Sequence, residues 1–241
     1  MNYDPRSFWD QRLSEQFDLR GTGEPGLSLA YNRACYDLRR RVLAGALRDA
    51  GVDPRGRSVL DVGCGTGFFT AYYLSRGARV TGLDITPTSI RRLRERFPEA
   101  QFIESDVSDV SLHERYDLVN AFDVLYHITD DARWERAVTH LALAVAPQGV
   151  LLLTDVFSEP ARSAEHVRAR GLPRYRELLQ RQGLEPQAVY PTHVLLNREL
   201  GAFRLLNRLP GLLWSADRVL LALGGGHGPS ISKLLVARRL R

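Results

Sequence analysis

Lysine, cysteine and long apolar runs are scarce in this chain of 241 residues. Its two cysteines, Cys35 and Cys64, are too few for a disulfide framework or a four-thiolate zinc site, so a reducing, cytoplasmic compartment is expected. The longest uncharged stretch, residues 137–154, is interrupted by His140 and Pro147 and therefore predicts a helix followed by a strand, not a membrane span. Because the first 25 residues contain five acidic ones, no secretory signal peptide is expected.

Charge is unevenly distributed along the chain. Arginine and lysine together number 33 against 28 aspartates and glutamates, which gives a formal charge of +5. From Asn197 onward eight basic residues stand against two acidic ones, so this segment carries +6 and the preceding residues sum to −1. The body is therefore near neutral and lacks the concentrated basic stripe of a nucleic-acid-binding protein.

The first 51 residues predict an N-terminal helical cap. A glycine-rich loop at residues 21–26 separates a short helix with a loose apolar stripe from a longer helix expected over residues 27–50. In the longer helix four apolar side chains recur at steps of three and four and therefore share one inward face: Cys35, Leu38, Val42 and Ala46.

From residue 57 onward strands and helices alternate, which is typical of a parallel sheet with crossover helices. The expected strands are residues 58–62, 79–83, 101–103, 117–122, 150–156, 187–194 and 231–237. The expected helices are residues 68–75, 88–97, 132–146 and 175–181. We therefore predict one α/β domain over residues 52–241.

A glycine-rich loop joins the first expected strand to its helix. The loop Gly63-Cys64-Gly65-Thr66-Gly67 allows a tight turn and a close approach of a ligand to the backbone. Its spacing differs from the Gly-x-Gly-x-x-Gly of pyrophosphate-binding loops, and it lacks the Gly-Lys-Ser/Thr end of a P-loop, so a dinucleotide or a nucleoside triphosphate is disfavoured. Cys64 is interpreted as a small space-filling residue, and Asp61 before the loop can orient its amides.

Acidic residues follow the next two expected strands. Asp84 lies 21 residues after Gly63, at the end of the second strand, where a carboxylate can accept both hydroxyls of a ribose. Asp106 follows the third strand, where a carboxylate can accept a hydrogen bond from an adenine amino group. The loop and the two acids together predict a ligand with an adenosine group at the carboxyl ends of the strands.

The segment Val59-Leu60-Asp61-Val62-Gly63-Cys64-Gly65-Thr66-Gly67 resembles motif I of the class I S-adenosylmethionine-dependent methyltransferases. Asp84 matches the ribose acid of that family, Asp106 matches its adenine acid, and residues 116–122 and 149–156 match its fourth and fifth strands. The resemblance spans about residues 57–157. It implies a Rossmann-like, doubly wound sheet of seven strands, the last one antiparallel, and S-adenosylmethionine as the cofactor.

The resemblance also implies where the cofactor binds. Gly63, Gly65 and Gly67 should line its methionine part, while Ile85 and Val107 should flank its adenine. Tyr31 lies in a region that closes over the cofactor in this family, although packing of its ring on an amphipathic helix is the alternative. The full set of expected cofactor-binding residues is Tyr31, Asp61, Gly63, Cys64, Gly65, Gly67, Asp84, Ile85, Asp106, Val107 and Phe122.

His127 is the candidate catalytic base, because it follows the fourth strand at the edge of the sheet where the methyl group should point. The alternative is a packing or hydrogen-bonding role. A base is needed only when the acceptor carries a proton that must leave early, as in a phenol or an alcohol. Asp123 and Asp155 also end strands, but the neighbouring asparagine of a magnesium site in this family is absent, so no metal is expected.

Residues 197–229, between the last two expected strands, predict two short apolar helices split by Pro210-Gly211. We expect this insertion to form a helical lid over an apolar substrate. The basic charge of the chain from Asn197 onward also suits a membrane surface or an acidic carrier protein. A homodimer contact or an ordinary covering of the core is a further alternative.

These observations predict an enzyme that methylates a hydrophobic, aromatic or polyketide-like small molecule in secondary metabolism, by in-line transfer to oxygen, nitrogen or carbon. Nucleic acid is not expected as the substrate, because no Asn-Pro-Pro-Tyr or Asp-Pro-Pro-Tyr follows the fourth strand and Lys233 is the only lysine available to an RNA ribose methylase. The alternatives are a nucleic-acid or carrier-bound substrate, and a protein that binds S-adenosylmethionine without transferring its methyl group.

Overall fold

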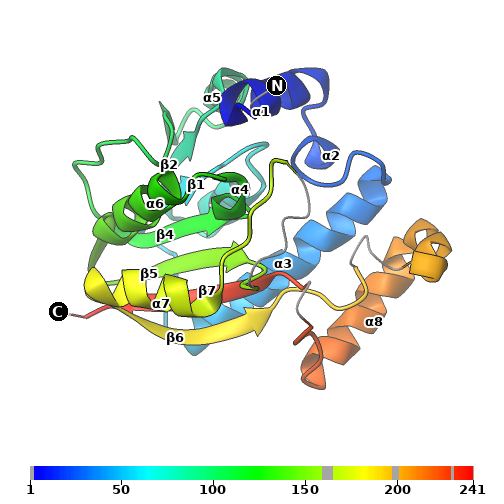
Figure 1. The fold of residues 1–241 in the computed structure, drawn as a ribbon. Coiled ribbons are helices and arrows are strands. Elements are labelled where there is room, and N and C mark those ends of the chain that lie inside the picture. Colours follow the sequence, from blue (N-terminus) through cyan, green and yellow to red (C-terminus); the bar gives the residue numbers. More distant parts are fainter. Residues whose placement is uncertain (1–2, 159–164, 197–200, 229–230, 241) are drawn as a thin grey trace.

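The computed structural model describes residues 3–158, 165–196, 201–228 and 231–240, with the backbone alone at 201–203. A seven-stranded sheet in the order β3-β2-β1-β4-β5-β7-β6 forms its centre (Figure 1). The strands are β1 Ser58–Val62, β2 Arg79–Asp84, β3 Gln101–Glu104, β4 Tyr116–Phe122, β5 Val145–Asp155, β6 Leu184–Pro191 and β7 Lys233–Arg239. The first five strands run parallel and β7 runs antiparallel between β5 and β6, which confirms the predicted Rossmann-like, doubly wound α/β fold.

Helices cover both faces of the sheet. The α-helices are α1 Pro5–Glu15, α2 Leu19–Thr22, α3 Leu29–Asp49, α4 Phe68–Ser75, α5 Pro87–Arg96, α6 Asp131–Leu143, α7 Leu172–Arg181 and α8 Pro210–Ala222. Two 3₁₀ helices, η1 Leu125–His127 and η2 Gly201–Arg208, complete the described elements. In Figure 1, α6 and α7 lie in front of the sheet and α3 lies behind it. Among the described residues, no helix has both the length and the apolar character that a bilayer crossing requires.

The central strand β5 shows why the sheet is buried on both sides. Leu151 and Leu153 point to the face that packs against α6 and α7. Val150 and Leu152 point to the opposite face, where α3 and α4 pack. Because side chains alternate along a strand, a continuous run of apolar residues is what a strand covered on both faces requires.

Several element boundaries differ from the sequence-based expectation, and two of them show why. Helix α6 ends at Leu143 because the chain enters the sheet at Val145, which pairs with Tyr116 of β4. Strand β6 ends at Pro191, while the backbone N–H groups of Val194 and the two following residues donate to the carboxylate of Asp217. Both differences arise from contacts between residues far apart in the sequence.

The N-terminal helices and α8 occupy different places around the sheet. Helix α1 packs on α5 at one end, while α3 crosses a face of the sheet and carries α8 on its outer side (Figure 1). The contact between α3 and α8 is apolar and includes Tyr31, Leu38, Leu196 and Leu213. The described part of the predicted lid therefore packs against α3.

Candidate active site

A cavity lies at the carboxyl ends of the parallel strands, between the glycine loop, the segment after β4 and helix α1. In open α/β sheets this edge is where ligands bind. Of the residues expected to bind the cofactor, those that line the cavity are Asp61, Gly63, Cys64, Asp84, Ile85, Asp106, Val107 and Phe122. His127 also lines it.

The glycine loop requires glycine for two physical reasons. Gly63, Gly65 and Gly67 have φ angles of 66°, 50° and 77°, which side chains rarely adopt. A Cβ atom at Gly63 would lie 2.3 Å from a methyl carbon of Val124, and one at Gly65 would lie 2.7 Å from the methyl carbon of Thr22. Gly63 lines the cavity, whereas Gly65 and Gly67 hold the shape of the loop behind it.

Asp84 fastens the glycine loop to the end of β2. Its Oδ2 accepts a hydrogen bond from the backbone N–H of Gly65 at 2.8 Å. Its Oδ1 accepts from the backbone N–H and the hydroxyl of Thr86 at 2.9 and 2.7 Å. Burial raises the pKa of this carboxyl, and the hydrogen bonds act in the opposite direction. Because each carboxylate oxygen has two lone pairs, Oδ2 can still accept from a ligand hydroxyl.

Asp61 is fully buried and joins two elements beneath the loop. Its Oδ2 accepts from the hydroxyl of Thr70 in α4 at 2.6 Å, and its Oδ1 accepts from the side-chain amide of Asn120 in β4 at 2.8 Å. The hydroxyl of Tyr73 donates in turn to Asn120 at 3.2 Å. Burial raises the pKa of Asp61 to about 6 despite these bonds. The carboxyl therefore links β1 to α4 and β4 beneath the loop.

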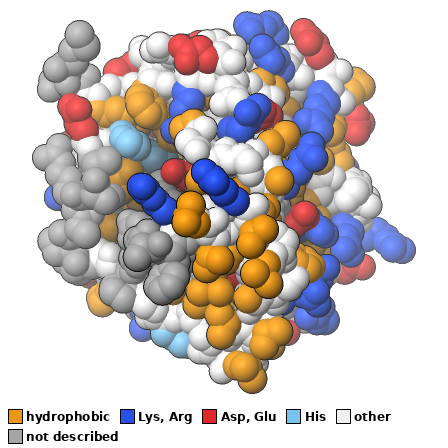
Figure 2. Space-filling view, turned by 90° about the vertical axis from the view of Figure 1, so that its right-hand side faces the viewer, with side chains coloured by type: hydrophobic (Ala, Val, Ile, Leu, Met, Phe, Trp, Pro, Cys, Tyr) orange, Lys and Arg blue, Asp and Glu red, His pale blue; other side chains and the backbone are white. Residues whose placement is uncertain are grey.

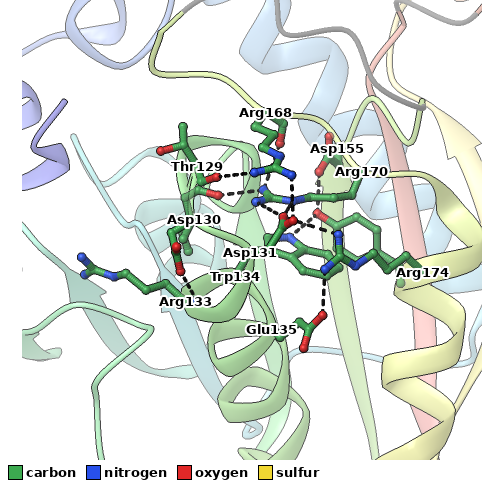
Figure 3. Close-up of polar contacts among 12 residues, drawn as sticks. Thr129, Asp130, Asp131, Arg133, Trp134, Glu135, Asp155, Arg168, Arg170 and Arg174 are labelled. Carbon is green, nitrogen blue, oxygen red and sulfur yellow. Dashed lines mark hydrogen bonds and ion pairs between the residues drawn. The ribbon is translucent and has the colours of Figure 1, made fainter. Parts of the chain in front are cut away.

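Asp106 has a partner that the sequence did not reveal. Its Oδ1 accepts from the backbone N–H of Ser108 at 2.7 Å, and its Oδ2 pairs with Arg133 of α6 at 2.6 Å. Arg133 lines the cavity as well, and Figure 3 shows that it extends away from the other arginines drawn there. The predicted adenine acid thus lies beside a guanidinium group at the mouth of the site.

A cluster of charged groups stabilises the part of the cavity lining next to Arg133 (Figure 3). Asp131, at the start of α6, pairs with Arg168 at 2.7 Å, Arg170 at 2.9 Å and Arg174 at 3.4 Å. Arg170 is buried and also donates to the carbonyl of Ile128, a residue that lines the cavity, at 2.7 Å. These contacts hold the segment between β4 and α6 against the segment that leads into α7.

Aromatic rings enclose a large part of the cavity. The rings that line it are those of Tyr3, Trp9, Tyr36, Phe68, Phe69 and Phe122. Phe69 meets Phe122 edge to face with ring centroids 4.6 Å apart, and Phe68 meets Tyr36 in the same way at 5.0 Å. Sequence reasoning identified Phe122 alone, because the other rings come from α3, α4, α1 and the residues just before α1, whose arrangement around the loop is set by tertiary packing.

His127 lies in η1 with one ring nitrogen engaged. Its Nδ1 is 2.9 Å from the backbone carbonyl of His166. Because a carbonyl can only accept, Nδ1 carries the hydrogen and Nε2 of the neutral ring keeps its lone pair. The ring also meets Trp9 edge to face at 4.8 Å. Burial lowers the pKa of His127 to about 4 and keeps the imidazole neutral.

The strand-end aspartates discussed for a metal are bound to protein groups. Asp123 pairs with Arg39 at 2.7 Å and adopts a φ angle of 58° just after β4. Asp155 is buried and accepts from the hydroxyl of Tyr175, to which the indole of Trp134 donates at 3.1 Å. Within the described ranges, no three or more histidine, cysteine or acidic side chains are grouped so that they could hold a metal ion.

Tyr31 is the one expected cofactor residue that the structure places away from the cavity and its loop. It is buried in the apolar contact between α3 and α8. Tyr36 lines the cavity instead and donates from its hydroxyl to Thr22 at 2.8 Å. Five residues correspond to about 140° around an α-helix, so the two tyrosines point to different sides of α3. No described residue of the segment 197–229 lines the cavity.

Comparison with known proteins gives a family match for part of the chain and a fold match for nearly all of it. Residues 59–149 match a family model described as a methyltransferase domain. The structure resembles that of magnesium protoporphyrin IX methyltransferase from Synechocystis with bound S-adenosylhomocysteine, with a TM-score of 0.65, 17% identity and coverage of 97% of each chain. Over residues 59–149 the chain is therefore similar to methyltransferases, and its fold is that of the class I S-adenosylmethionine-dependent methyltransferases.

Curated relatives in this family differ in their functions. Nodulation protein S of Sinorhizobium fredii is 33% identical over 113 residues, which are 46% of this chain and 52% of that protein. The ubiquinone biosynthesis O-methyltransferase of Serratia proteamaculans is 32% identical over 149 residues, which are 59% of this chain and 56% of that enzyme. The chain spans about half the length of the curated relatives it matches. The names of these relatives differ, so the substrate has to be inferred from the cavity.

Proposed function

We propose that this methyltransferase transfers the methyl group of S-adenosylmethionine to an aromatic or otherwise hydrophobic small molecule. The observation that carries this proposal is the set of aromatic rings around the cavity, above all Trp9, Tyr36 and Phe68. Rings of this kind bury apolar ligand surface and stack against aromatic ligands. The cavity contains no matching cluster of cationic side chains among its described lining residues, since Arg133 is paired with Asp106.

The residues around the glycine loop fit the proposed cofactor. Asp84 keeps accepting capacity for ribose hydroxyls, and Asp61 offers a buried carboxyl to the ammonium of the methionine part. Ile85 and Val107 supply apolar contacts on the adenine side. A side chain at Gly63 would clash with Val124 and occupy space beside the loop, so the proposed cofactor site requires glycine at this position. The fit supports the predicted role of each of these residues.

The bound cofactor supplies an electrophilic methyl group on a sulfonium, whose departure leaves a neutral thioether. The chain has to hold the acceptor in line with that methyl group and exclude water from it. Helix α1 is suited to this task, because its Trp9 lines the cavity and contacts His127. Acceptor atoms of oxygen, nitrogen or carbon are all compatible with such positioning.

His127 is proposed to act on an acceptor that carries a proton. The hydrogen on Nδ1 is held by the carbonyl of His166, so Nε2 can accept a hydrogen bond from a hydroxyl and take up its proton. The lowered pKa of His127, about 4, keeps the ring in the accepting form at neutral pH. The same low value makes it a weak base, which favours a role in orienting the hydroxyl and receiving its proton late in the transfer.

A role in secondary metabolism in the cytoplasm completes the proposal. The aromatic cavity suits a hydrophobic acceptor, and the name of one relative, the ubiquinone biosynthesis O-methyltransferase, supports oxygen as an acceptor atom. The experiment that tests the function supplies isotope-labelled S-adenosylmethionine with a panel of acceptors and measures S-adenosylhomocysteine and the methylated product. Binding without turnover on any acceptor class would favour the alternative of a binding protein.

A further inference from the structure

A stripe of aliphatic side chains on η2 and α8 is exposed to water. Leu205, Leu209, Leu212, Val219 and Leu223 are between 53% and 79% exposed. From Leu209 onward the steps are three, seven and four residues, which place these side chains on one side of the helix. We call these five residues the exposed apolar stripe. It extends from η2 along α8, whereas Leu143 and Leu240 are exposed leucines elsewhere in the chain.

The orientation of α8 is fixed, so the stripe cannot turn inward. The opposite side of the helix holds Asp217, which is fully buried and accepts from the backbone N–H groups of Val194 and Leu196 at 3.2 and 2.9 Å. Leu213 packs into the contact with α3. Trp214 lies between the guanidinium groups of Arg41 and Arg218, 4.8 and 4.7 Å from its ring centroid. These contacts leave the stripe pointing outward.

All exposed charged side chains of the same segment are positive. Arg204, Arg208 and Arg218 are exposed in the described residues 201–228, and the segment's single acidic residue there is the buried Asp217. Figure 2 views the molecule from the side toward which the parallel strands point, and hydrophobic side chains gather there with basic ones beside them. An apolar stripe with a basic border is complementary to a surface that is negatively charged and apolar beneath.

From this pattern we propose that η2 and α8 dock on the surface of an anionic lipid bilayer. The leucines would enter the boundary between headgroups and acyl chains, while the arginines contact anionic headgroups. A second copy of the chain fits less well, because a two-fold contact through the described residues 201–228 would bring arginines together, and these residues include no exposed acid to pair with them. Trp214, the aromatic residue of α8, packs against the contact with α3 and is not part of the stripe, so the stripe offers no aromatic anchor for a protein contact. The proposal does not depend on the identity of the methyl acceptor.

Vesicle sedimentation tests this docking. The full chain is mixed with vesicles of phosphatidylcholine alone or of phosphatidylcholine and phosphatidylglycerol in equal parts, and the bound fraction is measured at low and high salt. Binding is expected to the anionic vesicles and to weaken with salt. The double substitution L209S/L212S is expected to reduce the partition coefficient about tenfold or more, and R204Q/R208Q by a similar factor.

Matched substitutions on other surfaces serve as controls. L143S/L240S changes two exposed leucines outside the stripe, and R91Q/R176Q changes two exposed arginines on α5 and α7. Both control proteins should bind anionic vesicles as the unchanged chain does. All variants should retain their affinity for S-adenosylhomocysteine, which shows that they are folded.

Three outcomes would overturn the proposal. The first is no binding of the unchanged chain to anionic vesicles. The second is binding that L209S/L212S leaves intact. The third is a dimer, measured by light scattering, that L209S/L212S converts to a monomer, because the stripe would then be covered by a second copy.

Discussion

The carboxylate of Asp84 and the backbone N–H of Gly65 are joined by a hydrogen bond of 2.8 Å across 19 residues of chain. This bond ties the end of β2 to the middle of the glycine loop. One side chain therefore shapes the loop and, through its remaining lone pairs, offers an acceptor to the ligand. Substitutions of Asp84 that keep or remove an acceptor oxygen should therefore affect ligand binding to different extents.

Replacing Asp84 by alanine should weaken binding of S-adenosylhomocysteine by about 10- to 100-fold, because a charged acceptor is removed from the ribose site and from Gly65. Asp84→Asn keeps one acceptor oxygen and should lose less affinity. Calorimetry measures both. Asp53→Asn is the matched control, since Asp53 accepts from the N–H two residues ahead, as Asp84 does, but lies outside the cavity. Unchanged affinity in Asp84→Ala would remove Asp84 from the cofactor site.

The close approach of Gly63 to Val124 predicts a steric effect that can be reversed. Gly63→Ala places a Cβ 2.3 Å from the methyl carbon of Val124 and adds strain at a φ angle of 66°. We expect a loss of about 3 kcal/mol in the free energy of unfolding, measured by urea denaturation. Gly51→Ala has a similar φ of 67° with open space around the new Cβ, so it should show the strain alone.

A second substitution separates the clash from the strain. Val124→Ala removes the methyl carbon nearest to the new Cβ. The loss in free energy of unfolding in the double variant G63A/V124A should therefore equal the loss in Val124→Ala plus the strain loss measured in Gly51→Ala. If the double variant loses the full sum of the two single effects, the contact between Gly63 and Val124 is not the cause.

His127 predicts an unusual pH dependence of transfer to a hydroxyl acceptor. Its accepting form is the neutral ring, which with a pKa of about 4 persists as the pH falls well below the ordinary histidine value. At saturating cofactor, kcat should therefore stay level from about pH 8 to about pH 5.5 and decline only toward the pKa near 4. A decline centred near pH 6.5 would contradict the burial of the ring in its working state.

The same residue can be tested by substitution. His127→Ala should lower kcat on a hydroxyl acceptor by about 100-fold with a much smaller effect on cofactor affinity. His113→Ala changes an exposed histidine outside the cavity and should leave kcat unchanged. A wild-type kcat in His127→Ala would reduce His127 to a packing role beside Trp9.

The sequence predicted the parts of the site that depend on local chain order. The loop Gly63–Gly67, Asp84 and Asp106 each lie at or just after the end of a strand, so parallel pairing necessarily brings them to one edge of the sheet. The burial of β5 could also be predicted from the sequence, because a strand covered on both faces is apolar throughout and does not alternate between apolar and polar residues.

The remaining features depend on packing between distant segments. Tyr31 and Tyr36 are both aromatic residues of α3, and only the placement of α3 between the cavity and α8 decides which one lines the site. The pairing of Arg133 with Asp106 joins α6 to the loop after β3. In the C-terminal part of the chain, basic residues lie beside the exposed apolar stripe. None of these contacts leaves a periodic signal in the sequence.

The most direct test of the proposed function is turnover with labelled S-adenosylmethionine and two panels of acceptors. One panel contains phenols and polyketide-like aromatics, and the other contains polar, non-aromatic hydroxyl and amino compounds of similar size. The aromatic cavity predicts S-adenosylhomocysteine and a methylated product with the aromatic panel, and a KM for that acceptor that rises when Trp9 is replaced by alanine. Turnover confined to the polar panel, or cofactor binding without turnover on either, would contradict the account.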